Sequence, residues 1–151
     1  MNDRTKSSGD GDPTSTDSGR SGGVKITEES DILRARKAAR DVVEDLSFRI
    51  TDVTRIVTAV SELARNIHLY ADEGTMRWRV IEDGTRSGIE LTFEDDGPGI
   101  SDVEGVMRAE HSTSNGMGRG IQGTKKLMDE FELATSEADG TTIRIGKWAD
   151  D

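Results

Sequence analysis

The sequence predicts an α+β protein built as a two-layer sandwich, in which helices cover one face of a mixed β-sheet. Three observations lead to this fold class. Apolar residues recur at helical spacing over the first half of the chain, they then alternate with polar residues, and a later helical segment is followed by two more alternating segments. The 151 residues are enough for one domain with one hydrophobic core.

Composition excludes several classes of protein. The chain has no cysteine, which rules out disulfides and thiolate metal sites, and its two histidines argue against a zinc centre. The formal net charge of -10 argues against non-specific nucleic-acid binding, which requires Lys and Arg to displace counterions. No apolar run approaches the ~20 residues of a membrane span, and the N-terminus lacks the hydrophobic segment of a signal peptide. We therefore expect a cytoplasmic protein that binds neither nucleic acid nor membrane.

Residues 1–23 are predicted to form a disordered tail. They are mainly Ser, Gly, Asp and Thr with almost nothing apolar, so they bury too little surface to offset the entropy of ordering. The ordered domain is expected to span residues 24–148 and to open with a short strand over 24–27.

Two amphipathic helices are expected next. The first spans about 30–46, and its apolar residues fall at helical spacing: Ile32, Ala35, Ala39, Val42, Val43 and Leu46. Its other face carries Arg34, Arg36, Lys37 and Arg40, which either face solvent or dock a partner. The second helix follows Thr51, a suitable N-cap, and has the apolar stripe Val53, Ile56, Val57, Val60, Ala64, Ile67 and Tyr70.

The middle of the chain predicts a pair of strands. Apolar residues alternate with polar ones over 76–80 and again over 89–93, and the intervening EDGTRSG is typical of a turn. Each strand should therefore have one buried face.

The remaining segments complete the sandwich. A glycine-rich region over 97–123 is expected to hold a short helical piece over 103–109, and a further helix should run to about Phe131. The chain should close with strands over 132–136 and 142–148.

Glu62 and Asn66 lie one helical turn apart on the second helix, at the edge of its apolar stripe. A carboxylate there can accept a proton from an attacking hydroxyl, which contributes roughly 10²–10⁴-fold to a reaction rate. The amide oxygen of Asn66 can supply one of the few protein ligands that Mg²⁺ takes. A solvated helix edge is the alternative interpretation of this pair.

A second candidate feature is EDDGPGI, residues 94–100, directly after a strand. Asp95 ends the strand, and an ionised carboxylate only accepts hydrogen bonds, so it suits the amino group of adenine and repels the carbonyl of guanine. Gly97 and Gly99 lack a Cβ, which lets a flat ligand approach the backbone. An ordinary tight turn is the alternative.

The third feature is HSTSNGMGRGIQG, residues 111–123, whose glycines precede the last predicted helix. Free N–H groups and a helix N-terminus form a site for phosphate, and glycines let such a loop move as a lid. A flexible loop without a ligand is equally compatible. No Lys-Ser/Thr pair follows Gly123, so the P-loop pattern is absent.

Taken in order, the three features resemble the ATP-binding Bergerat fold of the GHKL superfamily. Glu62 and Asn66 match its N-box, and Asp95, Gly97 and Gly99 match its adenine-binding G1 box. The G2-box lid residues that this resemblance assigns to nucleotide binding are Ser114, Gly116, Met117, Gly118, Arg119 and Gly120.

Two further positions follow from the same resemblance. Thr141, in GTTI near the end of the chain, looks like the threonine of a late strand that helps to hold adenine. Ile100 either lines the adenine pocket or packs in the core.

The segments SELARNIHLYA, DDGPGI, STSNGMGRGIQGTKKLMDEF and GKW narrow the resemblance to RsbT-type serine/threonine kinases, which are related to RsbW-type anti-sigma factor kinases. This resemblance implies phosphorylation, with ATP and Mg²⁺, of a serine or threonine on a STAS-domain antagonist protein. Glu62 would be the base and Asn66 the magnesium ligand. It also implies docking onto a PP2C-type phosphatase. An RsbW-type anti-sigma factor and a nucleotide-gated binding module without significant turnover remain the alternatives.

Overall fold

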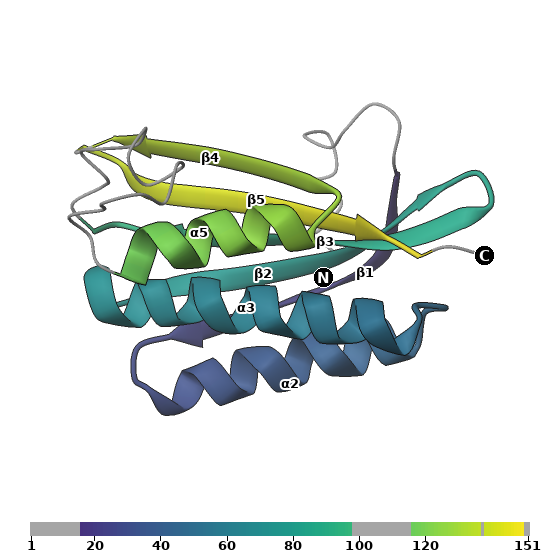
Figure 1. The fold of residues 1–151 in the computed structure, drawn as a ribbon, viewed down its shortest axis with the longest axis horizontal. Helices are drawn as coiled ribbons and strands as arrows, with labels where there is room; N and C mark the ends of the chain where they lie inside the picture. Colours follow the sequence, from purple (N-terminus) through teal and green to yellow (C-terminus); the bar gives the residue numbers. More distant parts are fainter. Residues whose placement is uncertain (1–15, 98–115, 137, 150–151) are drawn as a thin grey trace.

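The computed structural model describes residues 16–97, 116–136 and 138–149 (Figure 1). Its elements, in chain order, are β1 (Thr16–Ile26), α2 (Ser30–Glu44), α3 (Ile50–Tyr70), β2 (Gly74–Asp83), β3 (Arg86–Asp95), α5 (Gly116–Leu127), β4 (Glu130–Ser136) and β5 (Gly140–Trp148). None of the helices in the described part of the chain is long and apolar enough to cross a membrane.

The strands form one sheet in the order β1-β2-β3-β5-β4, and the three helices cover one of its faces (Figure 1). This arrangement confirms the α+β class and the two layers. The expectation of a mixed sheet is wrong, because all four strand pairings are antiparallel. Two pairs of neighbours, β2–β3 and β4–β5, follow each other directly in the chain. The chain between β1 and β2 forms α2 and α3, which run in opposite directions. β2 therefore starts at the end of the sheet where β1 finishes, and the two strands are antiparallel.

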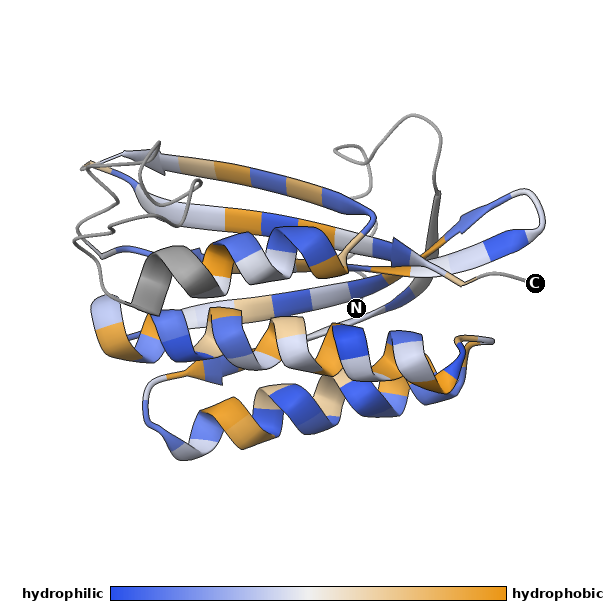
Figure 2. Cartoon of the chain, in the orientation of Figure 1, coloured by the Kyte–Doolittle hydropathy of each residue, from blue (hydrophilic) through white to orange (hydrophobic). Residues whose placement is uncertain are grey.

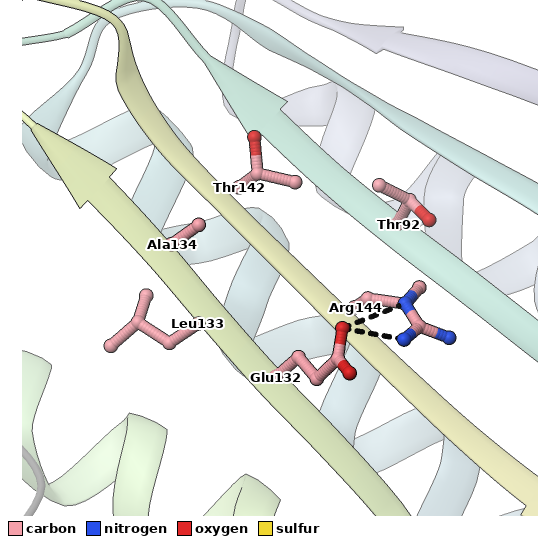
Figure 3. Close-up of a pocket in the computed structure, with 6 residues that line it drawn as sticks. All are labelled: Thr92, Glu132, Leu133, Ala134, Thr142 and Arg144. Atoms are coloured by element: carbon pink, nitrogen blue, oxygen red, sulfur yellow. Dashed lines mark hydrogen bonds and ion pairs between the residues drawn. The ribbon is translucent and has the colours of Figure 1, made fainter. Parts of the chain in front are cut away.

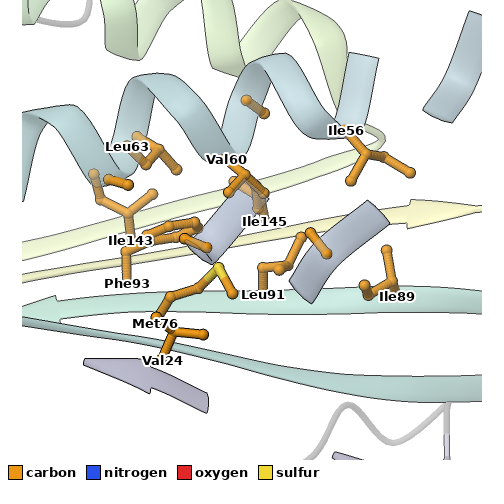
Figure 4. Close-up of a cluster of buried hydrophobic side chains, with 14 of the residues drawn as sticks. Val24, Ile56, Val60, Leu63, Met76, Ile89, Leu91, Phe93, Ile143 and Ile145 are labelled. Atoms are coloured by element: carbon orange, nitrogen blue, oxygen red, sulfur yellow. The ribbon is translucent and has the colours of Figure 1, made fainter. Parts of the chain in front are cut away.

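The hydrophobic core lies between the helical layer and the sheet (Figure 4). Met76, Leu91 and Ile145 point inward from the sheet and are 0% exposed, and they face Ile56 and Val60 of α3, which are also 0% exposed. Burying one such side chain stabilises the fold by about 1.5–3 kcal/mol. The alternation of hydrophobic and hydrophilic residues predicted for the strands and helices is visible along their ribbons (Figure 2).

The first strand is longer than the sequence predicts. β1 begins at Thr16, so part of the expected tail pairs with β2, and residues 1–15 lie outside the described part. Glycine-rich composition concealed this strand, because its stability comes from backbone pairing and not from its own side chains. At Gly22 a Cβ would lie 2.7 Å from Cζ2 of Trp78, so only glycine lets the strand cross that ring.

Several element boundaries also differ from the prediction. α3 starts at Ile50, which places Thr51 inside the helix instead of at its N-cap. The last helix ends at Leu127 and not near Phe131, because Asp129 already accepts a hydrogen bond from the backbone of Trp148 at 2.9 Å. The helical piece expected over 103–109 lies outside the described residues.

The corner between β1 and α2 depends on Asp31. Its carboxylate accepts hydrogen bonds from the backbone N–H of Thr27 at 2.9 Å and of Glu28 at 3.1 Å, and Arg34 donates to it at 2.8 Å. The bond from the Thr27 backbone, followed by that from Arg34, holds the pKa of Asp31 well below its usual range. The ionised carboxylate therefore stabilises the start of α2.

We expect Asp31→Asn to lower the free energy of unfolding at neutral pH and to do so less in acid. Because the folded-state pKa is lowered, the stabilisation is complete above the unfolded value of about 3.9 and is lost as the pH falls below it. Urea denaturation of both proteins between neutral pH and a pH of about 3 measures the difference between their free energies of unfolding, which should become smaller in acid. The control is Asp41→Asn, which removes an exposed pair with Lys37 and should change stability little. A difference in free energy of unfolding that stays constant with pH would contradict the stabilising role of the ionised Asp31 carboxylate.

Candidate functional site

The end of α3 lies against the end of β3, so two stretches distant in sequence meet. A Cβ added to Gly74 would lie 3.0 Å from Cγ2 of Ile67 and 3.1 Å from Cβ of Asp95. A Cβ added to Gly97 would lie 2.8 Å from Cβ of Ala71. The chain can approach itself this closely only because both positions are glycine.

Glu62 and Asn66 lie on the side of α3 that faces α5. A Cβ added to Gly120 of α5 would lie 2.9 Å from Oε1 of Glu62 and 3.8 Å from Oδ1 of Asn66. Thr124, which is fully buried, donates a hydrogen bond to the Gly120 carbonyl at 2.9 Å and bonds the two turns of α5 together. The structure therefore brings three of the predicted residues into one place.

The carboxylate of Glu62 is reachable from outside. Its Oε2 lies 3.4 Å from Nη1 of Arg65, and its side chain is 38% exposed. An ion pair between two half-exposed side chains contributes little stability. The second oxygen of Glu62, beside Gly120, is the one that faces the interior of the site.

The side chain of Asn66 is half-buried, and its amide nitrogen has no hydrogen-bond partner among the described residues. Its Nδ2 is buried and has no hydrogen-bond partner among the described residues, whereas buried polar atoms are normally paired. Its amide oxygen is of the kind that Mg²⁺ accepts, so this position fits a nucleotide-bound magnesium ion. The described residues contain no cluster of three or more Asp, Glu or His side chains that could hold a metal, so the remaining ligands would be phosphate and water oxygens.

Asp95 ends β3 opposite Thr141 of β5, and its Oδ1 accepts a hydrogen bond from the Gly97 backbone at 2.8 Å. Burial raises the pKa of Asp95, and the charge of Asp96 adds to this effect, whereas hydrogen bonds from the backbone of Gly97 and Thr141 oppose it. A partly desolvated carboxylate gains from one more donor, such as an amino group.

Gly140 lets the start of β5 lie close to the backbone of Asp95 and Asp96. Its φ is +81°, and a Cβ there would collide with the carbonyl oxygen of Asp95 and lie 2.8 Å from Cα of Asp96. Thr141, the next residue, is buried, and its hydroxyl lies 2.9 Å from that of Thr135. The hydroxyl predicted to hold adenine thus already has one partner in the sheet and retains capacity for another.

The sequence analysis expected the glycine run to form a loop before the last helix, but its described part lies within that helix. Gly116, Met117, Gly118, Arg119 and Gly120 belong to the first turns of α5. Each glycine costs a helix about 1 kcal/mol relative to alanine. Burial of Ile121 and Thr124 in the core offsets this cost in a way that local composition does not show. Gly99, Ile100 and Ser114 lie outside the described residues.

Sequence reasoning missed the glycines that make the close approaches, Gly74 and Gly140. Both stand at strand boundaries, beside Thr75 and Thr141. Glycine immediately before an alternating strand was the available signal, because such positions often mark a close backbone contact.

The helix-free face of the sheet carries a separate, shallow hollow of about 330 Å³ (Figure 3). It is lined by Thr92, Glu132, Leu133, Ala134, Thr142 and Arg144. Its charges satisfy one another, since Arg144 lies 2.7 Å from Glu90 and 2.5 Å from Glu132. We therefore place the functional site at the α3–α5 side of the molecule.

Comparison with known proteins identifies the family of the chain. Residues 27–147 match the family described as "Histidine kinase-like ATPase domain". The chain is 46% identical over 125 residues to the serine/threonine-protein kinase RsbT of Bacillus subtilis, covering 83% of this chain and 94% of that protein. It is 30% identical over 118 residues to the anti-sigma F factor of Clostridium novyi, covering 75% of this chain and 82% of that protein.

A solved structure shows the same fold. The structure of the RsbU and RsbW domains of a Mycobacterium tuberculosis protein superposes with a TM-score of 0.54 at 18% identity, over 86% of this chain and 33% of that one. The matched residues include both halves of the site, from α3 to β5. The chain belongs to the histidine kinase-like ATPase family and, within it, to the family of the serine/threonine-protein kinase RsbT.

Proposed function

We propose that this protein is a protein serine/threonine kinase that uses Mg-ATP within a partner-switching module. The observation that carries the proposal is the contact of Gly120 with Glu62 and Asn66, which sets a carboxylate and an amide beside the first turns of α5. The similarity to RsbT supports a phosphoryl transfer to protein.

Binding of ATP would use both halves of the site. The Asp95 carboxylate would accept a hydrogen bond from the adenine amino group, with Thr141 beside it and Gly97 leaving room for the base. The first N–H groups of a helix have no intrahelical partner and favour anions. The start of α5, at Gly116 and Gly118, would therefore bind the phosphates.

Transfer would proceed by positioning and charge stabilisation. Asn66 would hold the magnesium ion, which neutralises charge on the phosphates when bound. Glu62 would accept the proton of the acceptor hydroxyl as that oxygen bonds to the γ-phosphorus and the bond to ADP breaks. A base is required only if the phosphate is transferred, so Glu62 favours a kinase over a binding module without turnover.

The proposed acceptor is a STAS-domain antagonist protein, with a PP2C-type phosphatase as a second partner of the free kinase. Both follow from the resemblance to RsbT-type kinases.

An anti-sigma factor is the second candidate function. The anti-sigma F factors of Clostridium novyi and Heyndrickxia coagulans are each 30% identical to this chain. Binding to sigma factors of the same genome, measured by calorimetry with and without ATP, distinguishes the two candidates. Tight binding to a sigma factor would favour the anti-sigma function.

We expect Glu62→Gln to reduce phosphate transfer to the STAS-domain acceptor roughly 10²–10⁴-fold while ATP still binds, because an amide cannot accept the proton. Transfer is followed with radiolabelled ATP, and ATP affinity is measured by calorimetry in the presence of Mg²⁺. The control is Glu44→Gln, an exposed substitution at the end of α2. Unchanged transfer by Glu62→Gln would exclude this residue as the base.

Asp95→Asn should weaken ATP binding by about 10- to 100-fold, the range expected for one hydrogen bond to a charged group. It should also narrow the preference for ATP over GTP, because an amide can donate to the guanine carbonyl. ATP affinity of the wild type should fall as the pH is lowered toward the raised pKa of Asp95, since a protonated carboxyl is a weaker acceptor.

The matched control is Asp96→Asn, which alters the exposed neighbouring carboxylate. It should leave the preference for ATP over GTP unchanged. Equal nucleotide affinities for Asp95→Asn and the wild type would rule out the role given to Asp95.

A further inference from the structure

The inner face of the sheet becomes polar at the end that carries the site. Before that end, the inward-facing residues of β3, β5 and β4 are apolar and pack in the core, as in the row Phe93, Ile143 and Leu133. The last row is different, because the strand register pairs Asp95 with Thr141 and Thr141 with Thr135. One carboxylate and two hydroxyl groups from three strands therefore stand in one row.

Hydrogen bonds join the members of this row. The backbone N–H of Thr141 donates to the carboxylate of Asp95, and the hydroxyl of Thr141 lies 2.9 Å from the hydroxyl of Thr135. Thr141 is buried, whereas Thr135 is half-buried on β4, the edge strand. The row thus connects the carboxylate at the centre of the sheet to the edge of the sheet through two hydroxyl groups.

The hydroxyl pair restricts what Thr141 can offer to a ligand. A threonine hydroxyl has one proton and two lone pairs, so an unpaired hydroxyl suits a ligand atom with a lone pair and a ligand N–H equally well. If Thr135 donates to Thr141, one lone pair of Thr141 is occupied and its side-chain rotamer is held. The proton of Thr141 is then directed away from Thr135, and it suits a ligand atom that has a lone pair.

The edge of adenine fits these two groups of the row. Its amino group donates, which suits the carboxylate of Asp95, and the neighbouring ring nitrogen N1 has a lone pair, which suits a hydroxyl that donates. Guanine and hypoxanthine have a carbonyl and an N–H at the same two positions. The row therefore distinguishes the bases at two adjacent atoms, provided that the hydroxyl of Thr141 keeps its orientation.

We propose that Thr135 is a positioning residue for base recognition, which donates to the hydroxyl of Thr141 so that Thr141 donates to N1 of adenine, directly or through a water molecule. This inference rests on the proposed binding of ATP and adds a residue of the edge strand that lies outside the three sequence features of the site. Thr135 does not touch the nucleotide and acts through Thr141.

The test compares Thr135→Val with Thr135→Ser. Valine keeps the branched Cβ that suits a strand but removes the hydroxyl, whereas serine keeps the hydroxyl. Thr135→Val should weaken ATP binding about 3- to 10-fold, the range of one neutral hydrogen bond, and Thr135→Ser should bind ATP nearly as tightly as the wild type. Affinities are measured by calorimetry on the full chain in the presence of Mg²⁺.

Two analogues of ATP separate base recognition from a general disturbance of the site. In 1-deaza-ATP a C–H replaces N1, so the wild type and Thr135→Val should bind it equally well. ITP has an N–H at this position, so Thr135→Val should bind ITP no more weakly than the wild type does. The variant should therefore lose preference for ATP over ITP, whereas a merely structural role of Thr135 would lower the affinity for every nucleotide together.

A double-mutant cycle checks that Thr135 acts through Thr141. When Thr141 is already valine, adding Thr135→Val should cause no further loss of ATP affinity. The matched control is Thr92→Val, the same substitution at a half-buried position of β3 on the helix-free face of the sheet. All nucleotide affinities of this control should equal those of the wild type.

Four results would overturn the role of Thr135 and leave the proposed kinase intact. They are equal ATP affinity for Thr135→Val and the wild type, a parallel loss of affinity for all three nucleotides, failure of Thr135→Ser to bind ATP more tightly than Thr135→Val, and additive losses in the double-mutant cycle. Phosphate transfer is measured separately. If the affinities change as expected but the wild type transfers no phosphate, the kinase is refuted and the role of Thr135 stands. A wild type that binds no ATP would refute both.

Discussion

The close packing of α5 on α3 is the constraint on which the site depends. With hydrogen as its side chain, Gly120 lets α5 lie close to the carboxylate of Glu62, whose Oε1 would have to move if a Cβ stood 2.9 Å away. That approach places the second turn of α5 beside a carboxylate and an amide. The proposed kinase needs both parts together, because the carboxylate of Glu62 alone repels phosphate and the start of α5 alone lacks a base.

A second set of close contacts positions Asp95. Gly74, Gly97 and Gly140 each bring backbone against Asp95 or its neighbours. These glycines belong to three different elements or turns, so the carboxylate of Asp95 is positioned by the whole end of the sheet and not by its own loop. The site therefore consists of common residue types that are positioned by close backbone approaches at glycines.

The layers and the chemical groups could be predicted from sequence, because they depend on local spacing. Helical spacing in α2 and α3, and alternation in β2 and β3, reflect burial on one face of each element. The pairing of Glu62 with Asn66 is likewise a property of one helix. By contrast, the early start of β1 and the helical state of Gly116 depend on contacts with Trp78 and α3, which no local pattern encodes. The antiparallel sheet escaped prediction for the same reason.

The left-handed turn at Gly140 has a consequence for biosynthesis. Asp95 receives its support from β5, a strand made after every other element of the described fold. A nascent chain can therefore bury its helices against β2 and β3 while Asp95 still lacks this support. If Asp95 binds adenine as proposed, the site is complete only when β5 has paired with β3, so an unfinished chain would not bind ATP prematurely.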